Sequence, residues 1–378
     1  MKILVTGGAG FIGRHLAANL AQLGAEIVVL DSLEAQIHGP NADFPAELAA
    51  LRACKCVYGD VCDRETVSKQ LADVDAVVHL AAETGTAQSM YEILRYERAN
   101  VQGTATVLDV VANERPKRLR KLVIASSRAV YGEGKYRCAA HGIVYPRSRS
   151  AQAMRAGRFE PECPQCAAAV SVLPTSEDAP FAPCSFYGLT KQVQEQMTMM
   201  LGPTAELSVI ALRYQNVYGP GQSLSNPYTG LLAVFANHVR QGKPLNVFED
   251  GMESRDFVHV GDVIAATSAC LAGDVHGVHA LNVGSGAATP VAEVARLVRN
   301  YFKSGVPIEI TGTFRIGDIR HNVADISRAK ALIGYRPKWN FADGLQTFLR
   351  WADDQGTVDS AFEKSLVELK QRGLLGQS

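Results

Sequence analysis

Short apolar runs alternate with amphipathic stretches along residues 1–215 of the chain. Between the runs, helical periodicity is clearest from Phe11 to about Leu23 and from Ser185 to Leu201. Strands that are apolar throughout and alternate with helices are typical of a parallel sheet covered on both faces. The pattern predicts an α/β fold with a Rossmann-type, doubly wound parallel sheet. The runs that predict its strands are KILVTG (2–7), AEIVVLD (25–31), VYGDVCD (57–63), VDAVVHLAA (74–82), LRKLVIASS (119–127) and LSVIALRY (207–214).

The pattern changes after Gly219, where loops rich in glycine, proline and asparagine replace the regular alternation. We expect residues 216–352 to form mainly a smaller C-terminal substrate lobe, with some segments returning to the Rossmann domain. That domain then comprises residues 1–134 and 173–215. Residues 135–172 form an inserted loop, and residues 353–378 a tail with a polar helix.

Composition limits the partners of this protein. Its 378 residues carry 38 Lys plus Arg and 38 Asp plus Glu, so the formal net charge is zero. This balance argues against a nucleic acid or a membrane surface as partner. No stretch reaches the roughly 18 apolar residues that a membrane helix needs. Eight cysteines in an ordinary composition favour free thiols in a reducing compartment, so we expect a soluble, cytoplasmic protein.

Gly7, Gly10 and Gly13 form a GxxGxxG motif between the first strand and the first helix. Glycines at this spacing allow a tight turn and let the backbone approach a pyrophosphate closely. Asp31 ends the second strand, where a carboxylate binds the adenine ribose and repels a 2′-phosphate, so NAD is favoured over NADP. Asp60 and Val61 are expected beside the adenine. Two alternatives stay open: the glycines serve only the turn, and Asp60 is a helix N-cap.

The stretch SFYGLTK places Tyr187 and Lys191 four residues apart, on one face of a predicted helix. A neighbouring ammonium and a nicotinamide ring would lower the tyrosine pKa from about 10 and make it a base near neutral pH. Ser126 and Ser127, at the end of the fifth run, offer a hydroxyl to bridge Tyr187 and a substrate hydroxyl. A Ser-Tyr-Lys set beside a dinucleotide site predicts hydride transfer at a secondary alcohol. His79, at a strand end, is expected to be a structural hydrogen-bonding group.

Eight motifs, taken together, resemble the extended short-chain dehydrogenase/reductase family, in particular its nucleotide-sugar epimerases and dehydratases. They are TGGAGFIG (6–13), HLAA (79–82), NVQGT (100–104), YGLTK (187–191), RYQNVYGPGQ (213–222), SRDFVHVGDV (254–263), NVGSG (282–286) and RIGDIRH (315–321). The resemblance implies a tightly bound NAD, a nucleoside-diphosphate sugar as partner, and a homodimer formed through helices around 100–113 and 185–201. It also implies cofactor contacts from Phe11, Ile12, Leu80, Ala81, Ala82, Asn100, Tyr187, Lys191 and Tyr214.

The same resemblance implies contacts with the sugar nucleotide. In such enzymes the Asn of RYQN and the Arg of SRDFVHV contact it; here these are Asn216 and Arg255. Arg315, Asp318 and Arg320 would complete the clamp, and planar guanidinium groups suit a diphosphate. An ion pair that bridges the two domains is the alternative for Arg255.

The residues after Ser127 discriminate between reactions. Dehydratases of this family carry an Asp and a Glu there, whereas this chain has Arg128 and Ala129, so elimination of water is not expected. Asp31 argues against the NADPH-dependent reductases. The remaining reaction is epimerisation at one carbon. Tyr187 takes the 4-hydroxyl proton as hydride passes to NAD, and Ser127 holds that hydroxyl. The 4-keto sugar then turns over, hydride returns to the opposite face, and Tyr187 gives its proton back.

An insertion separates Ser127 from Tyr187, and it carries Cys138, His141, Cys163 and Cys166. A CxxH pair followed by a CxxC pair has the spacing of a closed tetrahedral zinc site, which leaves no open position for catalysis. We expect structural zinc in a zinc-ribbon-like loop. Unbound thiols and a redox-active CxxC pair are the alternatives, and Ala167 departs from the glycine usual after the second cysteine.

The insertion also narrows the resemblance. YGEGKYRC (131–138), the CxxC pair and LPTSEDAP (173–180) resemble the subgroup of dTDP-L-rhamnose 4-epimerases, which interconvert dTDP-L-rhamnose and dTDP-6-deoxy-L-talose. The loop HLAAETGTAQSM (79–90) is similar as well, which implies sugar contacts from Glu83, Thr84, Thr86 and Gln88. Two rival functions remain: a UDP-hexose or UDP-N-acetylhexosamine 4-epimerase, and a non-catalytic NAD-sensing regulator.

Overall fold

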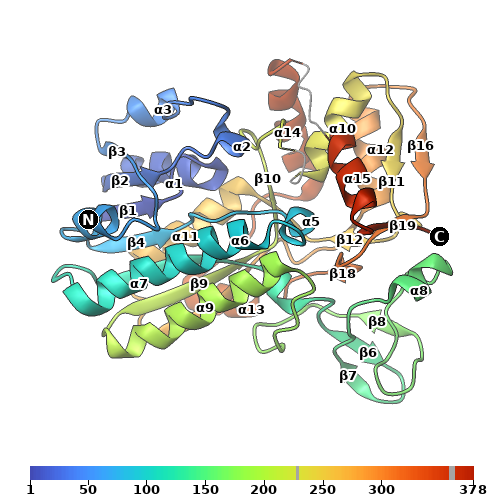
Figure 1. Ribbon diagram of the computed structural model, residues 1–378, viewed down its shortest axis with the longest axis horizontal. Coiled ribbons are helices and arrows are strands. Elements are labelled where there is room, and N and C mark those ends of the chain that lie inside the picture. The colour runs from blue at the N-terminus through green and yellow to red at the C-terminus, as the bar shows by residue number, and fades with distance from the viewer. Residues whose placement is uncertain (227–229, 357–361) are drawn as a thin grey trace.

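The computed structural model describes residues 1–226, 230–356 and 362–378; residues 227–229 of the expected substrate lobe and 357–361 of the expected tail lie outside the description. Its centre is a seven-stranded sheet in which every neighbouring pair of strands is parallel (Figure 1). This confirms the predicted Rossmann-type fold. In spatial order the strands are β14 (Val278–Val283), β9 (Ser208–Tyr214), β5 (Lys121–Ser127), β4 (Ala76–His79), β1 (Lys2–Thr6), β2 (Glu26–Asp31) and β3 (Cys54–Tyr58).

Helices cover both faces of this sheet because alternate strand residues point to opposite sides. Ile3 and Val5 of β1 pack in one apolar cluster, with residues from α1 (Phe11–Gln22) and α11 (Val260–Ala272). Leu4, between them in sequence, packs in a second cluster with residues from α4 (Arg64–Leu71) and α7 (Gly103–Glu114). The long helix α9 (Phe186–Thr204) lies beside α7 on this second side (Figure 1).

Two strands differ from the sequence prediction. The third strand lies at 54–58, three residues before the expected 57–63, and β14 had not been predicted. These are the two edge strands of the sheet. One side of an edge strand has no neighbour, so β3 has the mixed sequence CKCVY instead of an apolar run.

The C-terminal lobe has its own apolar cluster, formed by residues of its helices, of β11 and of neighbouring loops. The helices are α10 (Leu231–Arg240), α12 (Val291–Tyr301) and α14 (Phe341–Asp354), and β11 (Leu245–Val247) pairs with β16 (Ile308–Ile310). The tail packs on the lobe: after α15 (Phe362–Gln371), strand β19 (Leu375–Gln377) pairs with β17 (Thr313–Arg315). No helix among the described residues is long and apolar enough to cross a membrane.

The insertion leaves the Rossmann domain after β5 and returns before α9, and it projects below the C-terminal lobe in Figure 1. Its three-stranded antiparallel sheet has the order β7–β6–β8, with β6 at Tyr136–Cys138, β7 at Gly142–Val144 and β8 at Val170–Val172. The short helix α8 (Ala151–Arg155) packs on the C-terminal lobe, where Met154 and Phe159 contact Phe314.

Candidate functional site

A cavity of about 1160 Å³ lies at the carboxyl ends of the central strands and extends into the C-terminal lobe. It is lined by the loops after β1, β2, β4 and β5, by the start of α9, and by segments of the lobe around Arg255 and Arg315. This edge of a doubly wound sheet is where ligands bind in such folds. Most residues expected to bind cofactor or substrate line this one cavity: Gly7, Gly10, Phe11, Ile12, Gly13, Asp31, Asp60, Val61, Leu80, Ala81, Ala82, Glu83, Thr84, Thr86, Ser127, Tyr187, Lys191, Tyr214, Asn216, Arg255, Arg315 and Asp318.

The glycine motif forms a surface that a side chain would block. Gly7 has φ +65°, and a Cβ there would lie 2.6 Å from the backbone nitrogen of Ala81. At Gly13 a Cβ would lie 2.5 Å from the carbonyl oxygen of Gly7, so α1 packs directly on the turn. Gly10 caps the N-terminus of α1 without a side chain, which leaves backbone N–H groups available to a pyrophosphate. The close packing at Gly7 and Gly13 suits a dinucleotide site, and it is also what a tight turn alone would require.

Two carboxylates stand where the adenosine end of such a ligand would lie. The Asp31 carboxylate is held by the backbone N–H groups of Ala9 and Leu33, each at 2.9 Å. Asp60 accepts a bond from the N–H of Cys62 at 2.8 Å and one from Arg98 at 2.6 Å. Burial works against ionisation of Asp60, but these bonds lower its pKa overall. The N-cap of the following helix α4 is Asp63, so the N-cap alternative for Asp60 does not hold.

Tyr187 and Lys191 project from the first turns of α9, whose N-cap is the hydroxyl of Ser185. Burial raises the pKa of Tyr187 above the usual value of a tyrosine, and a hydrogen bond with Ser127 and the positive charge of Arg128 offset only part of this rise. Burial lowers the pKa of Lys191 to about 7, and its ammonium group donates to the carbonyl oxygen of Ala125 at 3.0 Å. Arg128 is thus a positive charge near Tyr187 that the sequence analysis had not considered, and the role expected of Lys191 stays a prediction.

The two serines at the end of β5 have different partners. Ser127 lies in the cavity, and its hydroxyl accepts a bond from the N–H of Ala129. The hydroxyl of Ser126 donates to Glu195 at 2.5 Å, and Glu195 forms a buried ion pair with Arg213 at 2.6 Å. The hydroxyl expected to hold the substrate is thus that of Ser127, and Ser126 belongs to a structural network.

His79 has the structural role expected of it. Its ring nitrogens lie 2.7 Å from the Thr6 hydroxyl and 3.0 Å from the Thr104 hydroxyl. Burial, and then the charge of Lys191, lowers its pKa to about 3, so the ring is neutral.

Guanidinium groups dominate the far wall of the cavity. Arg255 pairs with Asp318 at 3.2 Å, and this pair lies within the C-terminal lobe instead of bridging two domains. Arg315 lies over the ring of Phe248, 4.9 Å from its centroid, and its buried Nε has no hydrogen-bond partner among the described residues. Arg128 makes no ion pair with any residue that the structure describes. Unpaired buried donors of this kind suit an anionic ligand.

Three expected ligand contacts lie outside the cavity lining. Asn100 joins the loop after β4 to α9, because its side chain bonds with the backbone of Glu83 and with the Thr190 hydroxyl. Gln88 is buried against Gln36. The guanidinium group of Arg320 is enclosed by carboxylates, which are those of Glu160, Glu249 and Asp250.

Other cavity residues had no signal in the sequence. Phe248 and Glu249 come from the loop after β11, and Phe362 comes from the tail. None belongs to a recognisable motif, and Phe362 reaches the cavity because α15 folds back onto the lobe. The unpaired Arg315 beside two aromatic rings could be found only once these segments were placed.

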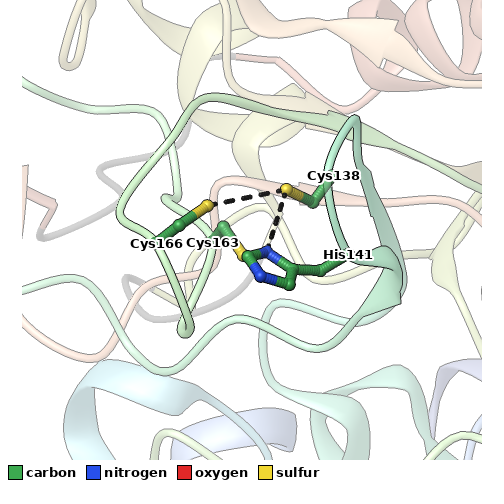
Figure 2. Close-up of side chains that lie close together, drawn as sticks. All are labelled: Cys138, His141, Cys163 and Cys166. Carbon is green, nitrogen blue, oxygen red and sulfur yellow. Dashed lines mark hydrogen bonds between the residues drawn. The ribbon is translucent and has the colours of Figure 1, made fainter.

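Cys138, His141, Cys163 and Cys166 point toward one another within the insertion (Figure 2). The sulfur of Cys138 lies 3.8 Å from that of Cys166 and 3.6 Å from Nδ1 of His141, which is 3.5 Å from the sulfur of Cys163. Metal–sulfur and metal–nitrogen bonds of about 2.3 and 2.0–2.1 Å place tetrahedral ligands about 3.8 Å (S to S) and about 3.6 Å (S to N) apart. These three distances match the edges of such a tetrahedron, and all four ligand atoms lie within 4.8 Å of one another.

The local backbone favours ionised thiols at this cluster. The N–H groups of Ala140 and His141 lower the pKa of Cys138. Ala167, which follows Cys166, adopts the left-handed conformation with φ 56°, as the glycine usual at this position would. The chain thus makes the same turn around the cluster with an alanine.

Comparison with known proteins places the chain in a family. The model of the NAD dependent epimerase/dehydratase family matches residues 3–151 and 164–284, and the interruption falls in the insertion. A dTDP-L-rhamnose 4-epimerase of Burkholderia thailandensis is 37% identical over 353 residues, which cover 93% of this chain and 94% of that protein.

Two solved structures show the same fold over nearly the whole chain. The UDP-glucuronic acid 4-epimerase of Bacillus cereus, in complex with UDP-glucuronic acid and NAD, superposes with a TM-score of 0.76 at 25% identity, covering 94% of this chain and 100% of the other. The UDP-glucose 4-epimerase of Thermotoga maritima, with UDP-glucose, gives a TM-score of 0.76 at 26% identity and covers 94% and 99%.

Proposed function

Because the chain belongs to the NAD dependent epimerase/dehydratase family, we propose that it is an NAD-dependent nucleotide-sugar 4-epimerase that interconverts dTDP-L-rhamnose and dTDP-6-deoxy-L-talose. The observation that carries the reaction type is the set Ser127, Tyr187 and Lys191 in one cavity, followed directly after Ser127 by Arg128. A guanidinium group cannot donate the proton that elimination of water requires near neutral pH. Reversible oxidation at one carbon remains.

Bound NAD supplies the acceptor and donor of hydride. The chain itself handles the proton and the geometry: Tyr187 takes the proton of the 4-hydroxyl, and Ser127 holds that hydroxyl by a hydrogen bond. The hydrogen bond of Ser127 and the charge of Arg128 oppose the effect of burial on the pKa of Tyr187. After the 4-keto sugar has turned within the cavity and presents the opposite face of C4 for reduction, Tyr187 returns the proton to the 4-oxygen.

The sugar nucleotide is held by the C-terminal lobe in this proposal. Arg255 and Arg315 bind the diphosphate, and the buried side-chain oxygen of Asn216, which has no partner among the described residues, accepts a bond from the ligand. Residues 1–134 and 173–215 hold NAD, and residues 216–352 hold the substrate. Resemblance in the insertion and the 37% identical relative support dTDP-L-rhamnose; the UDP-sugar epimerases of similar fold support the alternative, a UDP-hexose or UDP-N-acetylhexosamine.

NMR of the purified protein with dTDP-L-rhamnose, UDP-glucose and UDP-N-acetylglucosamine, each incubated separately, tests the function. The coupling constants of the sugar H4 change when C4 inverts. We expect inversion with dTDP-L-rhamnose alone. Inversion of a UDP-sugar alone would support the epimerase mechanism and would reject dTDP-L-rhamnose as the substrate. Bound NAD without inversion of any sugar would favour the non-catalytic regulator.

We assign the Cys/His cluster to structural zinc, because two short ligand pairs at tetrahedral spacing suit this ion. With all four positions taken by protein, zinc would stabilise the insertion and activate no water. Elemental analysis should find one zinc per chain in the wild type and much less in Cys166→Ser, whose cysteine is exposed. If the wild-type protein contains no metal, the zinc assignment is rejected, and unbound thiols or a redox-active CxxC pair are the explanations that remain.

The remaining assignments are the assembly and the location of the protein. We infer a homodimer in which α7 and α9 of the two copies pack together. Light scattering, which gives the molecular mass in solution, tests whether the protein is a dimer. Leu189 and Met200 are exposed apolar side chains on α9 and would be covered there. None of the eight cysteines is in a disulfide, and we infer a reducing, cytoplasmic environment.

A further inference from the structure

The insertion is connected to the wall of the cavity by buried ion pairs. Arg149 lies between the ligands His141 and Cys163 in sequence, and its side chain is only 3% exposed. Its Nη1 donates to both carboxylate oxygens of Glu249, at 2.8 and 2.9 Å. Its Nε donates to Glu133 at 3.1 Å. The insertion thus contributes a cation to a group of carboxylates that belongs to other parts of the chain.

A second arginine completes this group from the opposite side. Arg320 donates to Glu249 at 2.8 Å and, through Nη2, to Glu160 of the insertion at 2.6 Å. Its backbone N–H donates to the carboxylate of Glu133 at 2.9 Å. Glu133 and Glu249 are therefore shared between Arg149 and Arg320, and the two guanidinium groups neutralise carboxylates that burial would otherwise destabilise.

This group supports both expected diphosphate contacts from behind. Nη2 of Arg149 donates to the carbonyl oxygen of Asp318, whose carboxylate pairs with Arg255 in the cavity. Glu249 follows Phe248, whose ring lies under Arg315. Arg149 of the insertion therefore contacts Asp318, which pairs with Arg255. It also contacts Glu249, the neighbour of Phe248, whose ring lies under Arg315.

The backbone at Glu249 needs such support. Its φ is 50°, in the left-handed region that residues other than glycine rarely adopt. A strained conformation of this kind persists only where its surroundings hold it, and such residues gather at binding sites. Glu249 lines the cavity, and the two arginines bind its carboxylate. Its backbone N–H donates to the carbonyl oxygen of Thr313.

The insertion depends on the Cys/His cluster for its own order. Its apolar cluster consists of Tyr136, Cys138, Val144 and Cys163, with Val170 packed against them, and two of these are ligands. A segment with so small a core needs a metal or another cross-link to hold its shape. The position of Arg149 is therefore tied to occupancy of the metal site.

We propose that Arg149 is a positioning residue through which the metal-bound insertion holds Arg255 and Arg315 in the geometry that binds the diphosphate of the substrate. The inference rests on the proposed nucleotide-sugar function for the class of ligand. It assigns the insertion a role in substrate affinity. It assigns none in the chemistry of Ser127 and Tyr187.

Calorimetry with dTDP, UDP and NAD as separate ligands tests the proposal without relying on turnover. Arg149→Met should weaken binding of the nucleoside diphosphate that the wild type prefers by about tenfold or more, as expected when a buried charge network loses a partner. NAD affinity and zinc content should stay at the wild-type level. Arg149→Lys, which keeps the charge, should restore part of the affinity. Arg147→Met, an exposed arginine of the same insertion, is the matched control.

Metal removal supplies the second arm of the test. Cys166→Ser, or treatment of the wild type with a chelator, should weaken diphosphate binding as Arg149→Met does. In Arg149→Met, loss of the metal should cause less further weakening than it causes in the wild type, because part of the effect of the metal passes through Arg149. Added Zn²⁺ should restore binding in the chelated wild type.

Three results would overturn the proposal: wild-type diphosphate affinity in Arg149→Met, wild-type affinity in the metal-free protein, or an equal loss of NAD affinity, which would indicate general unfolding. These results differ from failure of the proposed function. If the wild type binds dTDP or UDP but inverts no sugar, the epimerase function is rejected. The role of Arg149 in diphosphate binding is still tested by the calorimetry described above.

Discussion

Ser126 and Ser127 form a matched pair of adjacent residues on β5 with opposite roles, and replacing each by alanine separates stability from catalysis. The hydroxyl of Ser126 is buried and donates to the ionised Glu195 at 2.5 Å. A hydrogen bond to a charged group contributes about 1.5–3 kcal/mol, so Ser126→Ala should lower the free energy of unfolding by that amount. Ser126 borders the cavity as Ser127 does, but its hydroxyl is already engaged by Glu195, so kcat should remain at the wild-type level.

Ser127→Ala should give the reverse result. Its hydroxyl caps the turn at Ala129, which contributes only about 1 kcal/mol to stability. In the proposed reaction the same hydroxyl holds the oxygen that loses its proton, and loss of one such donor typically lowers kcat about 10²- to 10³-fold. NMR of sugar inversion gives kcat, and urea denaturation monitored by circular dichroism gives the stability. A low kcat with wild-type stability in Ser126→Ala would refute the assignment.

Three further changes test the cavity and the metal site. Asp31→Ser should weaken NAD binding about 10- to 100-fold, through loss of a charged hydrogen bond to the ribose, and should let NADP bind; calorimetry that still shows rejection of NADP would contradict this role. Arg128→Met should raise the pKa of Tyr187, because the positive charge that lowers this pKa is lost, so the acid limb of the pH profile of kcat should move to higher pH. Arg118→Met, at an exposed arginine, should leave the acid limb in place. An unmoved limb in both variants would exclude an effect of Arg128 on the pKa of Tyr187. Ala167→Gly should relieve about 1 kcal/mol of left-handed strain and tighten zinc binding about fivefold in competition with a coloured chelator, whereas unchanged affinity would show that the turn is not strained.

The sequence was a good guide to the fold where burial was complete. The inner strands of the sheet are mostly apolar, and each was found within three residues of its observed position. The two edge strands were misplaced or missed, because β3 and β14 each leave one side unpaired and carry polar residues such as Lys55 and His279. The apolar run is a signal of central strands, and it weakens at the edges.

The candidate site was predictable to the extent that its parts are local in sequence. The glycine turn, the Tyr187–Lys191 helix turn and the two metal-ligand pairs each lie within a few residues, so spacing alone indicated their geometry. Arg320 shows the limit of this approach. Its motif suggested a ligand contact, but carboxylates from residues 160, 249 and 250 surround it, and their approach depends on long-range packing.

The two ends of the insertion meet where the chain leaves and re-enters the Rossmann domain. The N–H of Leu173 donates to the carbonyl oxygen of Lys135 at 2.9 Å, and the Thr175 hydroxyl accepts a bond from the N–H of Lys135. An excursion that starts and finishes at one point can be lengthened, shortened or exchanged without displacing Ser127 relative to Tyr187. In evolutionary terms, changes within this segment would alter how firmly the diphosphate is held, as proposed above, while β5 and α9 continue to carry the reaction centre.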